Sequence, residues 1–149
     1  MHKLDLNIAR LKLLLAEVSG KREVLTSTRQ QYQDQIARLV SFAVHEDGGV
    51  DRTLAMMMDV DARLRELDRQ EHYLHLIEEK ARRELESLQL TKLIDEARAR
   101  IAVLRQQQHS VEGGDDGRDA DWLAGEIRRL EGVIAQASGA AVKSISGGR

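Results

Sequence analysis

The sequence has 149 residues, of which 42% are hydrophobic, 32% are charged and only 3% are aromatic, with no proline and no cysteine. Few aromatic side chains and many straight-chain helix formers are typical of long helices joined along narrow seams rather than of a compact core. The 23 basic and 25 acidic residues nearly cancel, so the chain has no strong overall field to attract nucleic acid or an anionic membrane.

The absence of cysteine excludes a disulfide framework and a thiolate metal site, and it favours a reducing, cytoplasmic location. Asp5 and Arg10 follow closely behind Met1, where a signal segment would be apolar. No apolar run approaches the ~20 residues that span a bilayer. We therefore expect a soluble protein.

The first predicted helix covers about residues 3–45, where apolar residues recur at alternating steps of four and three. This heptad pattern is typical of a coiled coil. The apolar seam positions are Leu4, Ile8, Leu11, Leu15, Val18, Leu25, Tyr32, Ile36, Leu39 and Ala43. Two positions in the same frame, Arg22 and Arg29, carry a charge where an apolar side chain is expected.

A glycine pair within the segment 45–50 interrupts this pattern and predicts a turn between two helices. Asp51 is the predicted N-cap of a second helix over about residues 52–110. The apolar seam of that helix comprises Met57, Val60, Leu64, Leu67, Leu74, Ala81, Leu85 and Leu88. Its charged exceptions are Glu71 and Glu78.

An antiparallel pairing of these helices brings together residues whose numbers add to a constant, and the apolar seam residues pair at 99 or 100. The same register sets Arg22 opposite Glu78 and Arg29 opposite Glu71. We interpret these four residues as seam ion pairs that fix the alignment. A slip by one heptad would bury an arginine against leucine, at a cost of several kcal/mol.

Beyond Leu88 this register is expected to fail, and a second seam begins. Its residues are Ile94, Ala97, Ile101 and Leu104, followed after a glycine-rich loop by Leu123, Ile127, Leu130, Ile134 and Ala137 on a third helix of about 119–137. The predicted second turn lies between Asp115 and Asp116.

The predicted fold is all-α: an elongated antiparallel coiled-coil hairpin in which a long central helix is flanked by the first and third helices. A long hairpin covers residues 1–92, and a shorter second hairpin that shares the central helix covers residues 93–137. Residues 138–149, rich in Gly, Ser and Ala, are predicted to form a flexible tail.

A metal site on the second helix is one alternative. Glu71, His75 and either Glu78 or Glu79 lie one helical turn apart, with His72 adjacent, and metal sites use such a one-face spacing. The opposite stretch of the first helix supplies arginines rather than further ligands, which favours ion pairing. We predict no metal and no cofactor.

Calcium binding near the second turn is another alternative. Asp115, Asp119, Asp121 and Glu126 fall at positions 1, 5, 7 and 12 of a calcium loop, but Ala120 stands where that loop requires glycine. The competing interpretation is that Asp119 or Asp121 caps the third helix and places negative charge at its positive end.

No catalytic motif is present in the chain. It has no nucleophile elbow, phosphate loop, dinucleotide-binding glycine pattern or zinc-protease motif. A seam between two helices is also not expected to form a cavity of the few hundred Å³ that ligand sites use. We predict a protein that is not an enzyme, with no catalytic residues.

Arginines are frequent on the second and third helices, but acidic residues interleave with them. The basic positions are Arg63, Arg65, Arg69, Arg82, Arg83, Arg98, Arg100, Arg105, Arg128 and Arg129. A solvated face is the favoured interpretation. A membrane-surface or nucleic-acid-associated protein that uses the arginine-rich central helix stays open as an alternative function.

Several apolar residues exceed what a two-stranded seam needs. They are Leu13, Leu14, Val24, Tyr73, Leu76, Ile77, Leu90 and Leu93. The register places Val24 opposite Leu76, and Met56 and Met58 add adaptable apolar surface near the first turn. Because hairpins with a spare stripe pair into four-helix bundles or dock on another subunit, we predict a structural or adaptor protein that self-associates or binds a protein partner.

In outline the predicted hairpin resembles the small hairpin proteins of rotary and export machineries, such as the flagellar export stalk protein. The resemblance concerns shape rather than a residue motif. It implies a stalk-like or chaperone-like role in a larger assembly.

Overall fold

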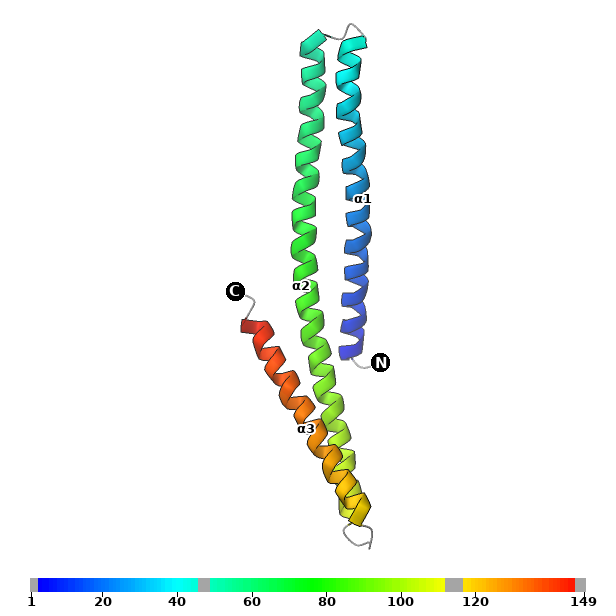
Figure 1. Ribbon diagram of the computed structural model, residues 1–149, viewed down its shortest axis with the longest axis vertical. Coiled ribbons are helices and arrows are strands. Elements are labelled where there is room, and N and C mark those ends of the chain that lie inside the picture. Colours follow the sequence, from blue (N-terminus) through cyan, green and yellow to red (C-terminus); the bar gives the residue numbers. More distant parts are fainter. Residues whose placement is uncertain (1–2, 46–48, 112–116, 147–149) are drawn as a thin grey trace. The chain divides into compact units, whose positions relative to one another are not determined.

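The described part of the chain is entirely helical. The computed structural model describes α1 (Lys3–His45), α2 (Gly49–Val111) and α3 (Gly117–Ser146), and it describes the side chains of residues 3–45, 49–110 and 119–140. α1 packs against α2, and α2 packs against α3 (Figure 1). The predicted all-α fold with three helices is confirmed.

The chain divides into two compact units. One comprises residues 11–82, which include most of α1 and the first part of α2. The other comprises the start of α1 together with the chain from Arg83 onward. The 63-residue helix α2 contributes to both units, and the predicted boundary at residue 92 lies inside the second of them.

In the unit of residues 11–82, α1 and α2 run antiparallel (Figure 1), and they pack along an apolar seam. Val18, Leu39, Val60, Leu67 and Ala81 are buried. The other apolar seam residues that the sequence predicts here are half-buried: Leu11, Leu15, Leu25, Tyr32, Ile36, Met57, Leu64 and Leu74. The seam therefore follows the heptad frame along nearly its whole length.

Ala43 is the exception, because it is exposed and its place in the predicted seam is wrong. The neighbouring Phe42 is half-buried instead. The guanidinium carbon of Arg52 lies 5.9 Å from the centre of the Phe42 ring, a cation–π distance. A large ring covers more apolar surface at the end of the seam than a methyl group does, so the packing shifts by one residue.

Helix α2 begins at Gly49 rather than at residue 52. Gly49 has a φ of +71°, in the left-handed region that favours glycine. Its carbonyl accepts a hydrogen bond from Thr53 Oγ1 at 3.0 Å. The predicted N-cap is wrong: Asp51 lies within the first turn, where its charge still favours the helix dipole. Residues 46–48, where the sequence predicts a turn, lie outside the described residues.

The second unit has its own apolar core between α2 and α3. Ala97, Ile101, Leu104, Leu123, Ile127 and Leu130 form one buried cluster, and Ile134 packs against it. Ala137 is buried as well. These are the residues that the sequence assigns to the second seam.

The start of α1 also belongs to this second unit. Asp5 Oδ1 lies 2.9 Å from Lys92 Nζ, and this contact raises the pKa of Lys92. The first two helices still contact each other beyond Leu88, but the numbers of Asp5 and Lys92 add to 97 rather than to the 99 or 100 of the seam, as expected for a register that fails there. An ion pair takes the place of an apolar contact there.

Helix α3 is longer than the sequence predicts, because it begins at Gly117 and continues to Ser146. Residues 138–146 of the predicted flexible tail are helical, and residues 147–149 lie outside the described residues. Adding residues to an existing helix costs far less than nucleating one, which explains why a Gly- and Ser-containing segment continues α3. Asp119 lies in the first turn of α3, so neither it nor Asp121 is an N-cap.

We predict that Gly49→Ala destabilises the protein by about 1 kcal/mol, because an L-residue rarely adopts a positive φ. Gly20→Ala is the matched control. Gly20 lies within α1 and has nothing within 4 Å of an added Cβ, so alanine there should stabilise by up to about 1 kcal/mol. Urea denaturation followed by circular dichroism measures both changes. Equal stability of the two variants would contradict a left-handed start of α2.

Candidate protein-interaction surface

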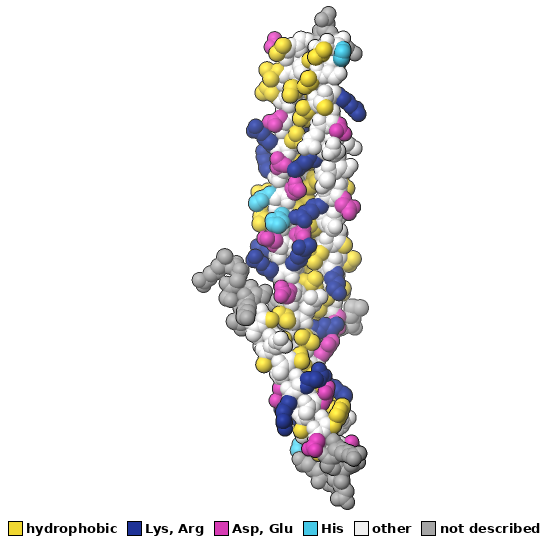
Figure 2. Space-filling view, viewed as in Figure 1, with side chains coloured by type: hydrophobic (Ala, Val, Ile, Leu, Met, Phe, Trp, Pro, Cys, Tyr) yellow, Lys and Arg dark blue, Asp and Glu magenta, His cyan; other side chains and the backbone are white. Residues whose placement is uncertain are grey.

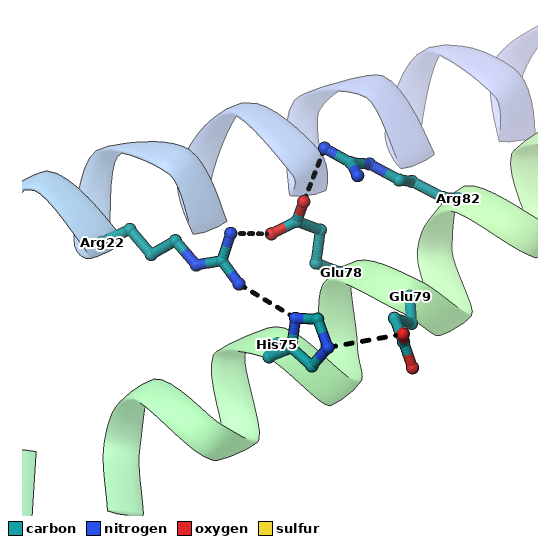
Figure 3. Close-up of polar contacts among 5 residues, drawn as sticks. All are labelled: Arg22, His75, Glu78, Glu79 and Arg82. Carbon is teal, nitrogen blue, oxygen red and sulfur yellow. Dashed lines mark hydrogen bonds and ion pairs between the residues drawn. The ribbon is translucent and has the colours of Figure 1, made fainter. Parts of the chain in front are cut away.

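A polar cluster interrupts the apolar seam where Arg22 of α1 reaches α2 (Figure 3). Arg22 Nη1 lies 2.6 Å from Glu78 Oε2, and Arg82 Nη2 lies 2.5 Å from Glu78 Oε1. Arg22 Nη2 donates to His75 Nδ1 at 3.2 Å, and His75 Nε2 lies 3.3 Å from Glu79 Oε1. Only 8% of Glu78 is exposed, so two arginines compensate a buried carboxylate.

A second ion pair lies further along the same seam. Arg29 Nη2 lies 2.5 Å from Glu71 Oε2 and 2.5 Å from Asp68 Oδ1. Both pairs that the sequence places opposite each other are thus present in the structure. Asp68 and Arg82 also take part, although heptad periodicity alone does not predict them. Their positions three and four residues from Glu71 and Glu78 place them on the same helix face.

These contacts oppose metal binding on this face of α2. Glu71, His75 and Glu78 each contact an arginine, whose positive charge repels a cation. Among the described residues, no group of three or more His, Cys, Asp and Glu side chains is arranged to hold a metal ion.

The calcium alternative does not fit the conformation of its ligands. Asp119, Asp121 and Glu126 lie on α3, whereas a calcium loop wraps its ligands around the ion. Asp115 lies outside the described residues. Arg129 Nη2 donates to Glu126 Oε1 at 2.5 Å, and this hydrogen bond lowers the pKa of Glu126.

An open groove of about 490 Å³ lies between α1 and α2 in the unit of residues 11–82. Its lining residues are Lys21, Val24, Leu25, Gln70, Tyr73, Leu74 and Ile77. Val24 is 64% exposed, Tyr73 62% and Ile77 43%. The expectation that a two-helix seam forms no space of this size is wrong, because these side chains extend the apolar surface outward on both sides of the seam.

The other predicted contact residues lie away from this groove. Leu13, Leu14, Leu76 and Leu93 are exposed, and Leu90 is half-buried. The expectation that Val24 faces Leu76 is wrong, since Val24 shares the groove with Tyr73 and Ile77. Successive residues of a helix point about 100° apart, which directs Leu76 to a different face.

The tip of the hairpin, where α1 ends and α2 begins, is a second exposed apolar surface. Hydrophobic side chains gather there in Figure 2. Met56 and Met58 belong to it together with four residues that the sequence pattern does not predict as contacts: Val40, Val44, Val50 and Leu54, all more than half exposed. Their nearness to the glycine turn is the sequence signal that could have found them.

Many arginines of α2 have acidic partners. Arg63 contacts Asp59 at 3.4 Å and Arg65 contacts Asp61 at 3.1 Å. Arg63 also lies over the ring of Tyr32, and the contact with Tyr32 raises the pKa of Arg63.

None of the described helices is long and apolar enough to cross a membrane.

We predict that Arg22→Leu destabilises the protein by about 1–2 kcal/mol, because it leaves the buried Glu78 with a single cationic partner. Replacing Arg22 and Glu78 together by leucine should recover this loss, since an apolar pair avoids the desolvation of two charges. The control is Arg65→Leu at an exposed ion pair, with an expected effect within about 0.5 kcal/mol. Urea denaturation compares the variants, and equal losses from Arg22→Leu and Arg65→Leu would contradict a seam role for Arg22.

Comparison of the chain with protein-family models, curated proteins and solved structures found no match. The groove, the tip and the seam ion pairs are therefore the features from which a function is inferred.

Proposed function

We propose that this protein is a non-enzymatic structural or adaptor protein that binds other protein chains through the groove and the tip, within a larger assembly. The observation that carries the proposal is the exposure of Val24, Tyr73 and Ile77 beside half-buried leucines in one groove. Exposed apolar side chains that lie together mark sites of interaction with proteins, membranes or ligands.

The shape and composition of the groove suit a helical partner. Leu25 and Leu74, which are half-buried seam residues, lie between the exposed side chains of α1 and α2. Lys21 and Gln70 add polar groups to the lining. An apolar centre with polar edges is the usual composition of an interface, and amphipathic helices bind in grooves between helices.

The ionisable side chains of the groove support binding rather than catalysis. They are Lys21 and Tyr73, and the described lining contains no His, Asp or Glu. General acid–base catalysis uses a positioned donor and acceptor of protons near the reacting atoms. The carboxylates that the seam does hold, Glu71 and Glu78, are bound by arginines.

Among the described residues, no contact favours the membrane-surface or nucleic-acid alternative over this proposal, because acidic neighbours on α2 reduce the positive charge that its arginines present. The proposal includes, as one kind of adaptor, a stalk-like or chaperone-like hairpin of an export machinery. We also propose a cytoplasmic location, supported by the absence of cysteine.

We predict that a photo-crosslinking amino acid at Tyr73 forms an adduct with one defined protein in the native cell. The same amino acid at Thr26 is the control. Thr26 is exposed on α1 and lines a polar hollow rather than the groove, so it should give no such adduct. Mass spectrometry identifies the product. Equal adduct patterns at both positions would contradict the proposal, as would adducts with nucleic acid or lipid at Tyr73.

A further inference from the structure

We propose that the groove binds a second copy of this chain, aligned in the same direction, so that two hairpins form a four-helix bundle. The twofold axis of this dimer runs parallel to the helices. The inference rests on the proposed function, in which the groove is a protein-binding surface, and it names the partner. The charges that border the groove on α1 and α2 support this choice.

On α1, charged and polar residues form a row along the side of the helix that lines the groove. Residues seven positions apart lie on the same face of helices packed along a heptad seam. Val24 lines the groove, so the seven-residue step places Glu17, Gln31 and Arg38 on the same side of α1, although Gln31 also lines the polar hollow that contains Thr26. All three are exposed.

On α2, the side of the helix that lines the groove carries a second row, whose charges are opposite to those of the α1 row. Tyr73 lines the groove, and the same seven-residue step places Asp59, Glu66 and Lys80 on its side of α2. These residues are exposed as well. Each residue of the α1 row has a counterpart on α2 at about the same height along the hairpin. The pairs are Glu17 with Lys80, Val24 with Tyr73, Gln31 with Glu66 and Arg38 with Asp59.

The number pairs add to 97 in each case, close to the 100 of the ion pair between Arg22 and Glu78. The members of each pair therefore lie at nearly the same height in the hairpin. Within one chain, Val24 and Tyr73 line the groove from opposite sides, and Glu17 forms no ion pair with Lys80 among the described contacts. Glu17, Arg38 and Lys80 have no ion pair among the described contacts, whereas Asp59 contacts Arg63 and Glu66 contacts Arg69 at 3.7 Å.

A second copy in the same direction places α1 of one chain against α2 of the other. Glu17 then faces Lys80 of the second copy, and Arg38 faces Asp59 of the second copy. Asp59 Oδ2 already lies 3.4 Å from Arg63 Nε in an ion pair. A carboxylate has enough lone pairs to accept from a second donor as well. Twofold symmetry repeats every contact, and the apolar pair of Val24 and Tyr73 lies between the two ionic ones.

The reversed orientation matches these charges less well. It places Val24 against Val24 and Tyr73 against Tyr73 of the second copy. Lys80 then faces Glu66, but Glu17 faces the uncharged Gln31. The same-direction dimer pairs both charged ends of the α1 row with opposite charges, and charge complementarity of this kind selects orientation.

Two charge-reversal variants test the dimer. The α1 variant combines Glu17→Lys with Arg38→Glu, and the α2 variant combines Asp59→Lys with Lys80→Glu. Sedimentation equilibrium should show dimers of the wild-type chain. Each variant alone should dimerise at least ~10-fold more weakly, because symmetry converts four opposite-charge contacts into like-charge contacts. An equimolar mixture of the two variants should regain dimers, since all contacts between unlike chains are again of opposite charge.

The chain that carries all four reversals is the matched control, and it should dimerise like the wild type. Circular dichroism verifies that each variant is helical. Because the sequence has no cysteine, a Val44→Cys variant accepts a single dye at the exposed tip. Energy transfer between dyes should be strong in a same-direction dimer and weak in a reversed one.

A wild-type chain that stays monomeric at every accessible concentration would overturn the inference. So would an α1 variant that dimerises as tightly as the wild type, since the reversed dimer does not need Glu17. A monomeric chain whose Tyr73 crosslinks to a different protein would overturn the dimer and leave the proposed function standing.

Discussion

The alignment of α1 with α2 depends on two arginines placed in an apolar seam. Arg22 and Arg29 each meet a carboxylate from the opposite helix. An apolar seam alone tolerates displacement by one heptad, because leucine still meets leucine. A guanidinium that meets leucine loses both water and its partner, so the displaced alignment is strongly disfavoured. The value of these pairs lies in selecting one register, since partly exposed ion pairs contribute little net stability.

The groove depends on this register. Val24 and Tyr73 come from different helices, and their joint lining of one groove requires the alignment that the arginines select. One face of the hairpin is polar, with Arg22, His75 and Asp68 near the seam. The other combines apolar side chains at the groove with charged residues above and below it. The hairpin therefore has one face that is mainly polar and one that carries exposed apolar side chains.

Sequence periodicity was sufficient to predict the helices, the antiparallel register and both seams, because heptad spacing directly determines which residues face a neighbouring helix. It failed where local packing or helix propagation decides the outcome. Phe42 replaces Ala43 at the end of the seam because ring size matters there. The end of α3 was missed because composition alone does not show that an established helix extends through Ser146.

The candidate surface was predictable only in part. Counting apolar residues beyond the seam identified Val24, Tyr73 and Ile77, but their grouping depends on the angular position of each side chain. That angle separates Ile77 from Leu76 although the two are adjacent. The tip residues around Val50 were missed because short apolar segments beside a turn resemble the seam in sequence.

The ion pair between Asp5 and Lys92 joins residues far apart in sequence, which has a consequence for the order of folding. During synthesis, α1 leaves the ribosome well before the part of α2 that pairs with its first residues. The contacts between α2 and α3 are more local and have less loop-closure entropy to overcome. The beginning of α1 therefore cannot pair with α2 until the middle of α2 has been synthesised, and until then we expect its apolar side chains to be exposed on the nascent polypeptide.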